Sequence, residues 1–152
     1  MLLLVLACTQ TPESIDPETM VKVQTQNLEF KDGLAYQPYS ETAYTGQSLE
    51  TYEDGTPSVD ATYKKGKLEG RYKSWYDNKQ IKEDSTFSAG VLHGRSTQWY
   101  LNGNKKEAAT YNNGALDGSY TAWSEAGIKT KEGFYRNGTK EGRVTEWYNN
   151  GL

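Results

Sequence analysis

Short segments in which aromatic and polar residues alternate fill most of the chain, and the whole pattern recurs every 24 residues. One glycine series shows this period directly: Gly46, Gly70, Gly94, Gly118 and Gly142. Two further series keep the same period: Gly66, Gly90, Gly114 and Gly138, and Gly55, Gly103, Gly127 and Gly151, with Lys79 in the one missing place. A fixed period of this length is the signature of a repeat protein.

Each repeat holds two segments rich in Tyr, Trp, Thr and Val, separated by turns that contain glycine. Aromatic and β-branched residues favour strands, and glycine-containing turns join antiparallel strands. A two-residue turn would force Ala89 and Ala126 to positive φ, so we expect three-residue loops in which only the glycine is left-handed. The sequence therefore predicts an all-β protein, a single-layer antiparallel β-meander of tandem 24-residue hairpin repeats.

Alternation along such strands predicts which side chains share a face of the sheet. Two aromatic series, which we call the aromatic ladder, and one series of small residues are expected on one face. The ladder consists of Trp75, Trp99, Trp123 and Trp147 with Tyr63, Phe87, Tyr111 and Tyr135, and the small residues are Ala61, Ser85, Ala109 and Gly133. The other face is expected to hold Tyr52, Tyr76, Tyr100 and Tyr148 with Leu68, Leu92 and Leu116. A register shift of one residue would regroup these sets.

The period also divides the chain into parts. Residues 1–8 are predicted to be a truncated signal peptide with a lipobox, residues 9–24 a flexible linker, and residues 25–45 an opening hairpin that turns at Asp32 and Gly33. In this hairpin, Tyr36, Tyr39 and Tyr44 are expected to cap the first repeat. The repeats then occupy residues 46–152, as 46–69, 70–93, 94–117, 118–141 and a partial repeat over 142–152.

The first eight residues, MLLLVLAC, form an apolar run that ends in the single cysteine of the chain. A polar, proline-containing stretch follows, which is the layout of a secretory segment that leads into a linker. The stretch from Val5 to Cys8 resembles the lipobox of bacterial lipoproteins. This resemblance implies that Cys8 is lipidated and anchors the protein in the cell envelope, and Thr9 after the cysteine points to the outer membrane. The alternatives are an idle cysteine and a cytoplasmic protein.

The aromatic content indicates that the chain folds although aliphatic residues are few. It has 12 Tyr, 4 Trp and 3 Phe, and its net charge is only -3. Tyr and Trp bury a ring while the polar tip stays wet, which suits a thin sheet better than a deep core. The balance of 17 basic and 20 acidic side chains gives no electrostatic footprint for nucleic acid. A single cysteine excludes an internal disulfide.

The chain lacks the residues that most catalytic and metal sites need. His93 is the only histidine, so neither a His-based triad nor a multi-histidine metal site can be assembled. We interpret His93 as a solvated turn residue, because the equivalent places hold other polar residues: Glu69, Asp117 and Glu141. Neighbouring carboxylates such as Glu83 and Asp84 should point to opposite faces of a strand. We therefore expect no enzymatic activity, no metal and no cofactor.

The segments YKKGKLEGRYKSWY, YNNGALDGSYTAW and YRNGTKEGRVTEWYNNG resemble MORN repeats of the bacterial MORN-variant type. The resemblance covers about residues 28 to 152, with local departures at Thr51, Lys79 and Ser124. It implies a repeat β-sheet scaffold used for protein or lipid contact. Together with the lipobox, we therefore expect a non-enzymatic scaffold at the cell envelope that contacts a protein, a membrane lipid or a glycan. The opening segment DGLAYQPYSETAYTGQ is similar to the lead-in of bacterial proteins labelled antitoxins, which implies the alternative of an antitoxin or immunity protein that neutralises a partner toxin.

Two roles remain open for the aromatic ladder. In the first, each Trp packs over a small residue of the adjoining strand and shields the backbone, so that Trp99→Ala would cost about 3 kcal/mol. In the second, the row is partly exposed and takes a peptide, a glycan or a lipid headgroup. We expect the first role to dominate.

Overall fold

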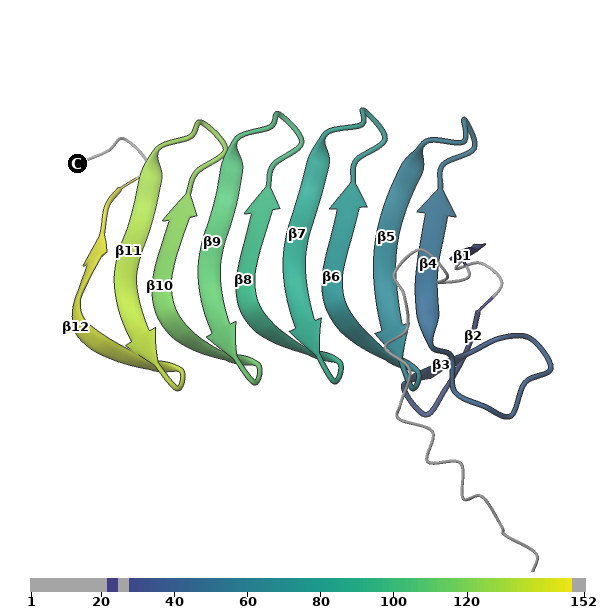
Figure 1. Cartoon of the computed structure of the whole chain (residues 1–152). Helices are drawn as coiled ribbons and strands as arrows, with labels where there is room; N and C mark the ends of the chain where they lie inside the picture. Colours follow the sequence, from purple (N-terminus) through teal and green to yellow (C-terminus); the bar gives the residue numbers. More distant parts are fainter. Residues whose placement is uncertain (1–21, 25–27, 149–152) are drawn as a thin grey trace, which may run out of the picture.

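A computed structural model of the chain describes residues 22–24 and 28–148. It shows one long single-layer sheet with a small hairpin near its N-terminal end (Figure 1). The described residues contain no helix, and the all-β prediction is confirmed. The strands are β1 (Lys22–Gln24), β2 (Glu29–Lys31), β3 (Leu34–Tyr36), β4 (Gly46–Thr51), β5 (Pro57–Lys64), β6 (Lys67–Trp75), β7 (Ile81–Ser88), β8 (Val91–Trp99), β9 (Lys105–Asn112), β10 (Ala115–Trp123), β11 (Lys129–Arg136) and β12 (Thr139–Glu146).

The long sheet is a meander. Its order is β1-β4-β5-β6-β7-β8-β9-β10-β11-β12, and each strand from β4 to β12 is antiparallel to the next one in the chain. At the N-terminal end, β1 pairs with β4 in parallel. The predicted antiparallel meander is therefore confirmed. Strands β2 and β3 form a separate two-stranded sheet that turns at Asp32 and Gly33.

The turns that join one repeat to the next differ from the prediction. They have two residues, both left-handed, as at Ala89 (φ 50°) and Gly90 (φ 88°). The same pair of positive φ angles occurs at Lys65-Gly66, Asn113-Gly114 and Asn137-Gly138. The three-residue loop predicted at Ala89 was wrong, because two-residue type I′ turns match the right-handed twist of the strands and so offset the cost of a left-handed alanine.

The turns inside the repeats follow the prediction. In the first, the Gly55 amide donates to the Tyr52 carbonyl at 2.9 Å, and the Tyr52 amide donates to the Thr56 carbonyl at 2.8 Å. Only the third residue of each loop has a positive φ, and Ala126 avoids it. That third residue is Gly55, Gly103 or Gly127, and in one repeat it is Lys79 with a φ of 69°.

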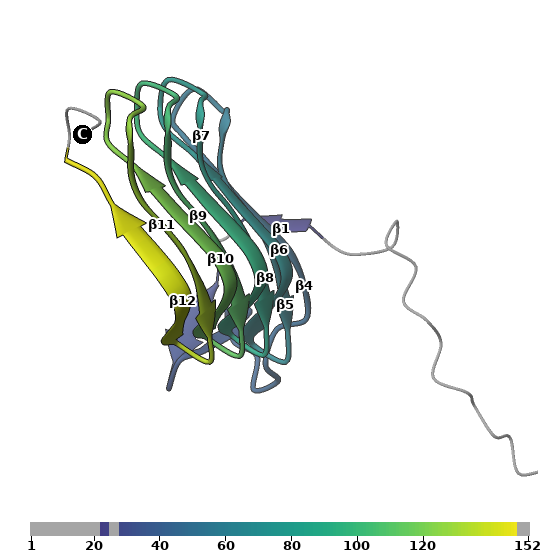
Figure 2. The same cartoon turned by 90° about the vertical axis from the view of Figure 1, so that its left-hand side faces the viewer.

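A β-bulge lies at the glycine that opens each repeat from Gly70 onward. Between β5 and β6, Ala61 pairs with Tyr72 and Tyr63 pairs with Leu68. The two paired residues are thus two positions apart on β5 but four positions apart on β6. Gly70 lies inside this bulge with a φ of 76°. Bulges bend strands, and the strands of the long sheet curve along their length (Figure 2). Because the insertion is two residues long, Leu68 and Tyr63 remain on one face.

One face of the long sheet, which we call the tyrosine face, carries the small series and the Tyr/Phe series. Tyr72 lies between Ala61 and Ser85 in the register, and Tyr120 lies between Ala109 and Gly133. The leucines belong to this face too, because each pairs directly with the Tyr/Phe series, as Leu68 does with Tyr63. The prediction that Leu68, Leu92 and Leu116 lie opposite that series was wrong.

The tryptophans lie on the other face, which we call the tryptophan face. Ser74 pairs with Glu83 and therefore belongs to the tyrosine face, so alternation turns Trp75 to the opposite side. The same holds for Trp99 and Trp123, which follow Gln98 and Ala122. The predicted grouping of the Trp series with the small residues was wrong. A second bulge beside each tryptophan shifts the pairing register of the two strands by one residue, which places the tryptophan on the other face.

The hairpin of β2 and β3 covers the tyrosine face at its N-terminal end. Leu28, Ala35 and Tyr44 are buried together, and Tyr63 of the sheet packs against them. Backbone hydrogen bonds fix this arrangement: Ala35 N donates to Gly66 O at 2.9 Å, and Gly66 N donates to Tyr44 O at 2.7 Å. Of the three tyrosines expected to form a cap, Tyr44 is buried and Tyr39 is fully exposed.

Candidate binding surface

The tyrosine face is filled by its own side chains. Tyr72 meets Phe87 edge to face at a centroid distance of 5.8 Å, and Tyr120 meets Tyr135 in the same way at 5.7 Å. The residues beside these rings are small and almost completely buried, as Ala61 and Ser85 show at 1 % exposure each. Large rings over small neighbours give this single layer its packed core.

A carboxylate lies within this packing and accepts two hydrogen bonds. The Tyr120 hydroxyl donates to Glu107 Oε2 at 3.0 Å, and the Tyr111 hydroxyl donates to Glu107 Oε1 at 3.3 Å. Burial first, and then the Glu107 charge, raises the pKa of Tyr111 to about 12, and the pKa of Tyr120 rises for the same reasons. Both hydroxyls thus remain protonated donors near neutral pH.

The tryptophan face carries indole rings beside lysine side chains. Trp75, Trp99, Trp123 and Trp147 are all half-buried. Lysine ammonium groups lie 5.3 Å from the Trp75 ring, 5.9 Å from the Trp123 ring and 5.8 Å from the Trp147 ring, within the range of cation–π attraction. These ammonium groups belong to Lys73, Lys105 and Lys129.

Polar side chains make up the rest of the tryptophan face. An open cleft of about 250 Å³ crosses β8, β9 and β10, and its lining includes Arg95, Thr97, Thr110, Ser119 and Thr121. In another part of this face, Arg71 Nη2 lies 2.6 Å from Asp84 Oδ2. The face thus combines partly exposed indole rings with hydroxyls and charges of both signs.

Tyrosine hydroxyls join successive repeats, a contact that the sequence reasoning missed. The hydroxyls of Tyr52, Tyr76 and Tyr100 donate to the main-chain carbonyls of Trp75, Trp99 and Trp123 at 2.7, 2.8 and 2.9 Å. The available signal was the tyrosine that recurs with the same 24-residue period at Tyr52, Tyr76 and Tyr100. This series ends where Ser124 replaces the tyrosine.

His93 has a structural role that two residues at equivalent positions, Glu69 and Thr45, share. Its Nδ1 accepts from the Asn113 amide at 3.5 Å, whereas Glu69 Oε2 accepts from the Ala89 amide at 2.8 Å. Thr45 Oγ1 accepts from the Lys65 amide in the same way, at 2.9 Å. His93 is exposed, as expected, but it lies on strand β8 and supports the turn of the following repeat.

The described residues bring no catalytic cluster together. Residues 22–24 and 28–148 hold no group of three or more His, Cys, Asp or Glu that would bind a metal ion. The Ser85 hydroxyl donates to Glu83 on the tyrosine face, while Asp84 binds Arg71 on the other. Cys8 lies outside the described residues. Within the described part, no helix has the length and apolar character to cross a membrane.

Comparisons with known proteins agree with this repeat architecture. The family model of the MORN repeat variant matches residues 68–89 and 92–113. No curated protein matches the chain significantly. A solved structure of the Glycosylation Associate Protein (Gap123) complex from Streptococcus agalactiae aligns with 15 % identity and a TM-score of 0.33, over 79 % of this chain. The chain spans only 21 % of that protein.

The two matched segments each contain one hairpin of the long sheet and the bulge beside it. MORN repeats are a non-catalytic type of repeat that generally mediates protein or membrane contacts. The family match thus identifies MORN-variant repeats at residues 68–89 and 92–113, in the central hairpins of the sheet.

Proposed function

We propose that this chain is a non-enzymatic scaffold whose tryptophan face binds a protein partner at the bacterial cell envelope. The observation that carries the proposal is the difference between the two faces. On the tyrosine face, the rings of Tyr72 and Tyr120 each pack edge to face against a second ring, whereas the half-buried rings of Trp75, Trp123 and Trp147 lie beside lysine ammonium groups. Trp and Arg are enriched at the centres of protein interfaces, which supports this face as the contact surface.

The polar groups between the tryptophans favour a protein partner over a lipid. Arg95, Thr97 and Thr121 line an open cleft, and such groups bind main-chain and side-chain polar atoms. Insertion into a bilayer would instead place these side chains in an apolar medium at a cost. A lipid or glycan ligand is an alternative outcome of the test.

The partner can be trapped by a photoreactive amino acid placed at Ser119, which is exposed on β10 beside Thr110 of β9. We expect cross-linking to one defined protein in envelope extract, and loss of that product when Trp99 and Trp123 are both changed to Ala. The matched control carries the same group at Glu53, an exposed turn residue. Equal products from both positions would contradict the proposed face, and a toxin as the captured partner would favour the antitoxin function.

Envelope association is a separate part of the proposal and rests on the apolar run that ends at Cys8. A lipid chain on this cysteine, together with an acylated terminus, would supply a stable membrane anchor. Feeding labelled palmitate to cells that express the wild type or Cys8→Ser tests it. We expect label and membrane partition only in the wild type, and a wild-type protein found only in the cytosol would contradict it.

A further inference from the structure

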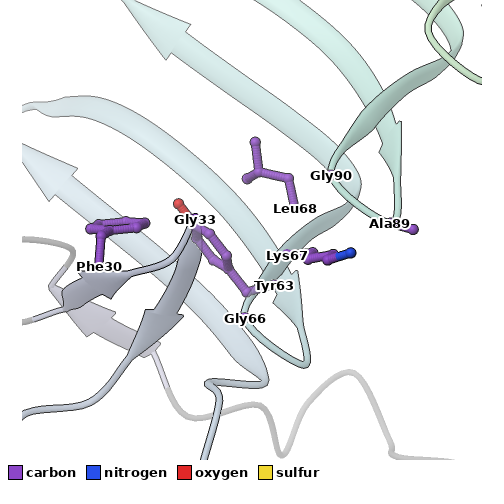
Figure 3. A pocket seen from close by; sticks show the side chains of 8 residues that line it. All are labelled: Phe30, Gly33, Tyr63, Gly66, Lys67, Leu68, Ala89 and Gly90. Carbon is purple, nitrogen blue, oxygen red and sulfur yellow. The ribbon is translucent and has the colours of Figure 1, made fainter.

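The N-terminal hairpin leaves a pocket between itself and the first two turns that join the repeats. Figure 3 shows Phe30 of β2, Tyr63 of β5 and Leu68 of β6 around it, with Gly90 on its far side. The pocket has a volume of about 310 Å³. This volume lies at the lower end of the range of about 300–1,000 Å³ that is usual for small-molecule sites.

The walls of the pocket are mainly apolar. The Phe30 ring lies 6.5 Å from the Tyr63 ring at an interplanar angle of 59°, and 58 % of Phe30 is exposed. Leu68 completes this apolar surface, while Gly33, Gly66 and Gly90 contribute backbone without side chains. An aromatic ring this exposed at a pocket wall leaves apolar area available to a ligand.

One of the turns beside the pocket is rich in lysine. Lys67 lines the pocket, whereas Lys64 and Lys65 belong to the same turn but not to the lining. Lys64 and Lys67 are direct cross-strand partners, an arrangement of like charges that destabilises a sheet. Within residues 22–24 and 28–148, none of these three ammonium groups lies within 4.0 Å of a carboxylate oxygen.

The other turns between repeats lack this charge. In place of Lys64, Lys65 and Lys67, the three later turns carry Ser88, Ala89 and Val91; Asn112, Asn113 and Ala115; and Arg136, Asn137 and Thr139. The three lysines are thus found at one of the two turns that border the hairpin pocket and at no later turn, so turn formation alone does not account for them.

We propose that this pocket binds a small apolar carboxylic acid, with its hydrocarbon part between Phe30, Tyr63 and Leu68 and its carboxylate at Lys67. Lys64 and Lys65 add to the attraction, because their charges lie in the same turn. Charge-assisted hydrogen bonds from ammonium groups to a carboxylate are stronger than neutral ones, and burial of the hydrocarbon part supplies the remaining affinity. Tyr63 and Leu68 place the apolar part of this site on the tyrosine face, and none of the four tryptophans lines it.

Decanoate serves as the probe, and its binding is followed by amide NMR shifts of the ¹⁵N-labelled full chain. We expect saturable shifts at Gly33, Gly66 and Gly90, and none at Gly114 and Gly138 in the equivalent turns. Affinity should fall as salt concentration rises. Equal shifts at all five glycines would show nonspecific surface association and overturn the proposal, as would equally tight binding of decyltrimethylammonium.

Two variant pairs identify the contacts. Lys67→Gln should weaken decanoate binding about tenfold, whereas Lys140→Gln, an exposed lysine of the last hairpin, should leave it unchanged. Phe30→Ser should weaken binding similarly, whereas Phe134→Ser should not, although the two phenylalanines are 58 % and 59 % exposed. Unchanged amide shifts in β7–β12 show that each variant is folded. Wild-type affinity in both Lys67→Gln and Phe30→Ser would overturn the proposal.

Discussion

The two faces of the sheet use aromatic residues for different purposes. On the tyrosine face, Tyr72 and Tyr120 lie over small residues and meet a second ring at 5.8 and 5.7 Å. On the tryptophan face, the rings of Trp75, Trp123 and Trp147 lie beside lysine ammonium groups. In this single-layer sheet, the paired rings and the small buried residues beside them thus share one face, and the tryptophans lie on the other.

The largest expected effect comes from removing a ring of the tyrosine face. Tyr72→Ala should lower the free energy of unfolding by about 3 kcal/mol, because the ring leaves a cavity between Ala61 and Ser85 and loses its contact with Phe87. Urea melts measure this change. Tyr39→Ala, at a fully exposed tyrosine, is the control and should stay within about 0.5 kcal/mol of the wild type. Equal melts for the two variants would contradict a packed tyrosine face.

A smaller effect is expected at alkaline pH, where the Tyr111 hydroxyl of this face titrates at a higher pH in the folded than in the unfolded chain. The pKa of Tyr111 is raised from 10.0 to about 12 in the folded chain. Above pH 10 the unfolded chain therefore loses this proton first, and stability that is complete below pH 10 declines as the pH rises toward 12. Glu107→Gln removes the neighbouring charge, so tyrosinate absorbance should appear at lower pH. An unchanged titration would exclude a role for the Glu107 charge.

The hydroxyls that join successive repeats should each contribute less. Tyr76→Phe removes the 2.8 Å hydrogen bond to the Trp99 carbonyl and keeps the ring. We expect a loss of about 1 kcal/mol in urea melts, which is typical of one hydrogen bond. Tyr148→Phe, at an exposed tyrosine, should have no measurable effect. If both variants melt together, these hydrogen bonds do not hold the repeats to one another.

The smallest expected effect has the opposite sign. Lys79 occupies a glycine position with a φ of 69°, where a side chain is strained. Lys79→Gly should raise the free energy of unfolding by about 0.5 kcal/mol, since relief of strain exceeds the added entropy of the unfolded chain and the loss of the exposed pair with Asp54. Gly103→Lys, at the equivalent position, should lower it. A destabilised Lys79→Gly variant would show that the contacts of the lysine side chain stabilise the fold by more than its backbone strain costs.

The 24-residue period was sufficient to predict the strands and their antiparallel order, because period and strand-forming residues are local properties of the sequence. It also predicted the loops inside the repeats, where Gly55 or Lys79 is left-handed and Ala126 is not. It failed at the turn that contains Ala89, where the twist of two strands outweighs the preference of one residue.

The predicted distribution of the Trp and Leu series over the two faces of the sheet was wrong, because the repeat period does not reveal where β-bulges interrupt the alternation of side chains. The bulges at Gly70 and beside Trp75 repeat in every unit, so an alignment of the repeats cannot separate them from regular strand. The hydrogen-bond donors to Glu107 could not be predicted from the sequence either, because the register of β9 and β10 is what brings Tyr111 and Tyr120 to this carboxylate. The lipidation predicted at Cys8 stays a prediction.

The most direct test of the difference between the faces uses two residues of strand β10. Tyr120 lies on the tyrosine face and Trp123, three residues later, on the tryptophan face. In parallel urea melts, the account predicts that Tyr120→Ala loses about 3 kcal/mol, whereas Trp123→Ala loses only about 1 kcal/mol. An equal or greater loss for Trp123→Ala would mean that the tryptophans form a core of their own, and would contradict the assignment of a free binding face.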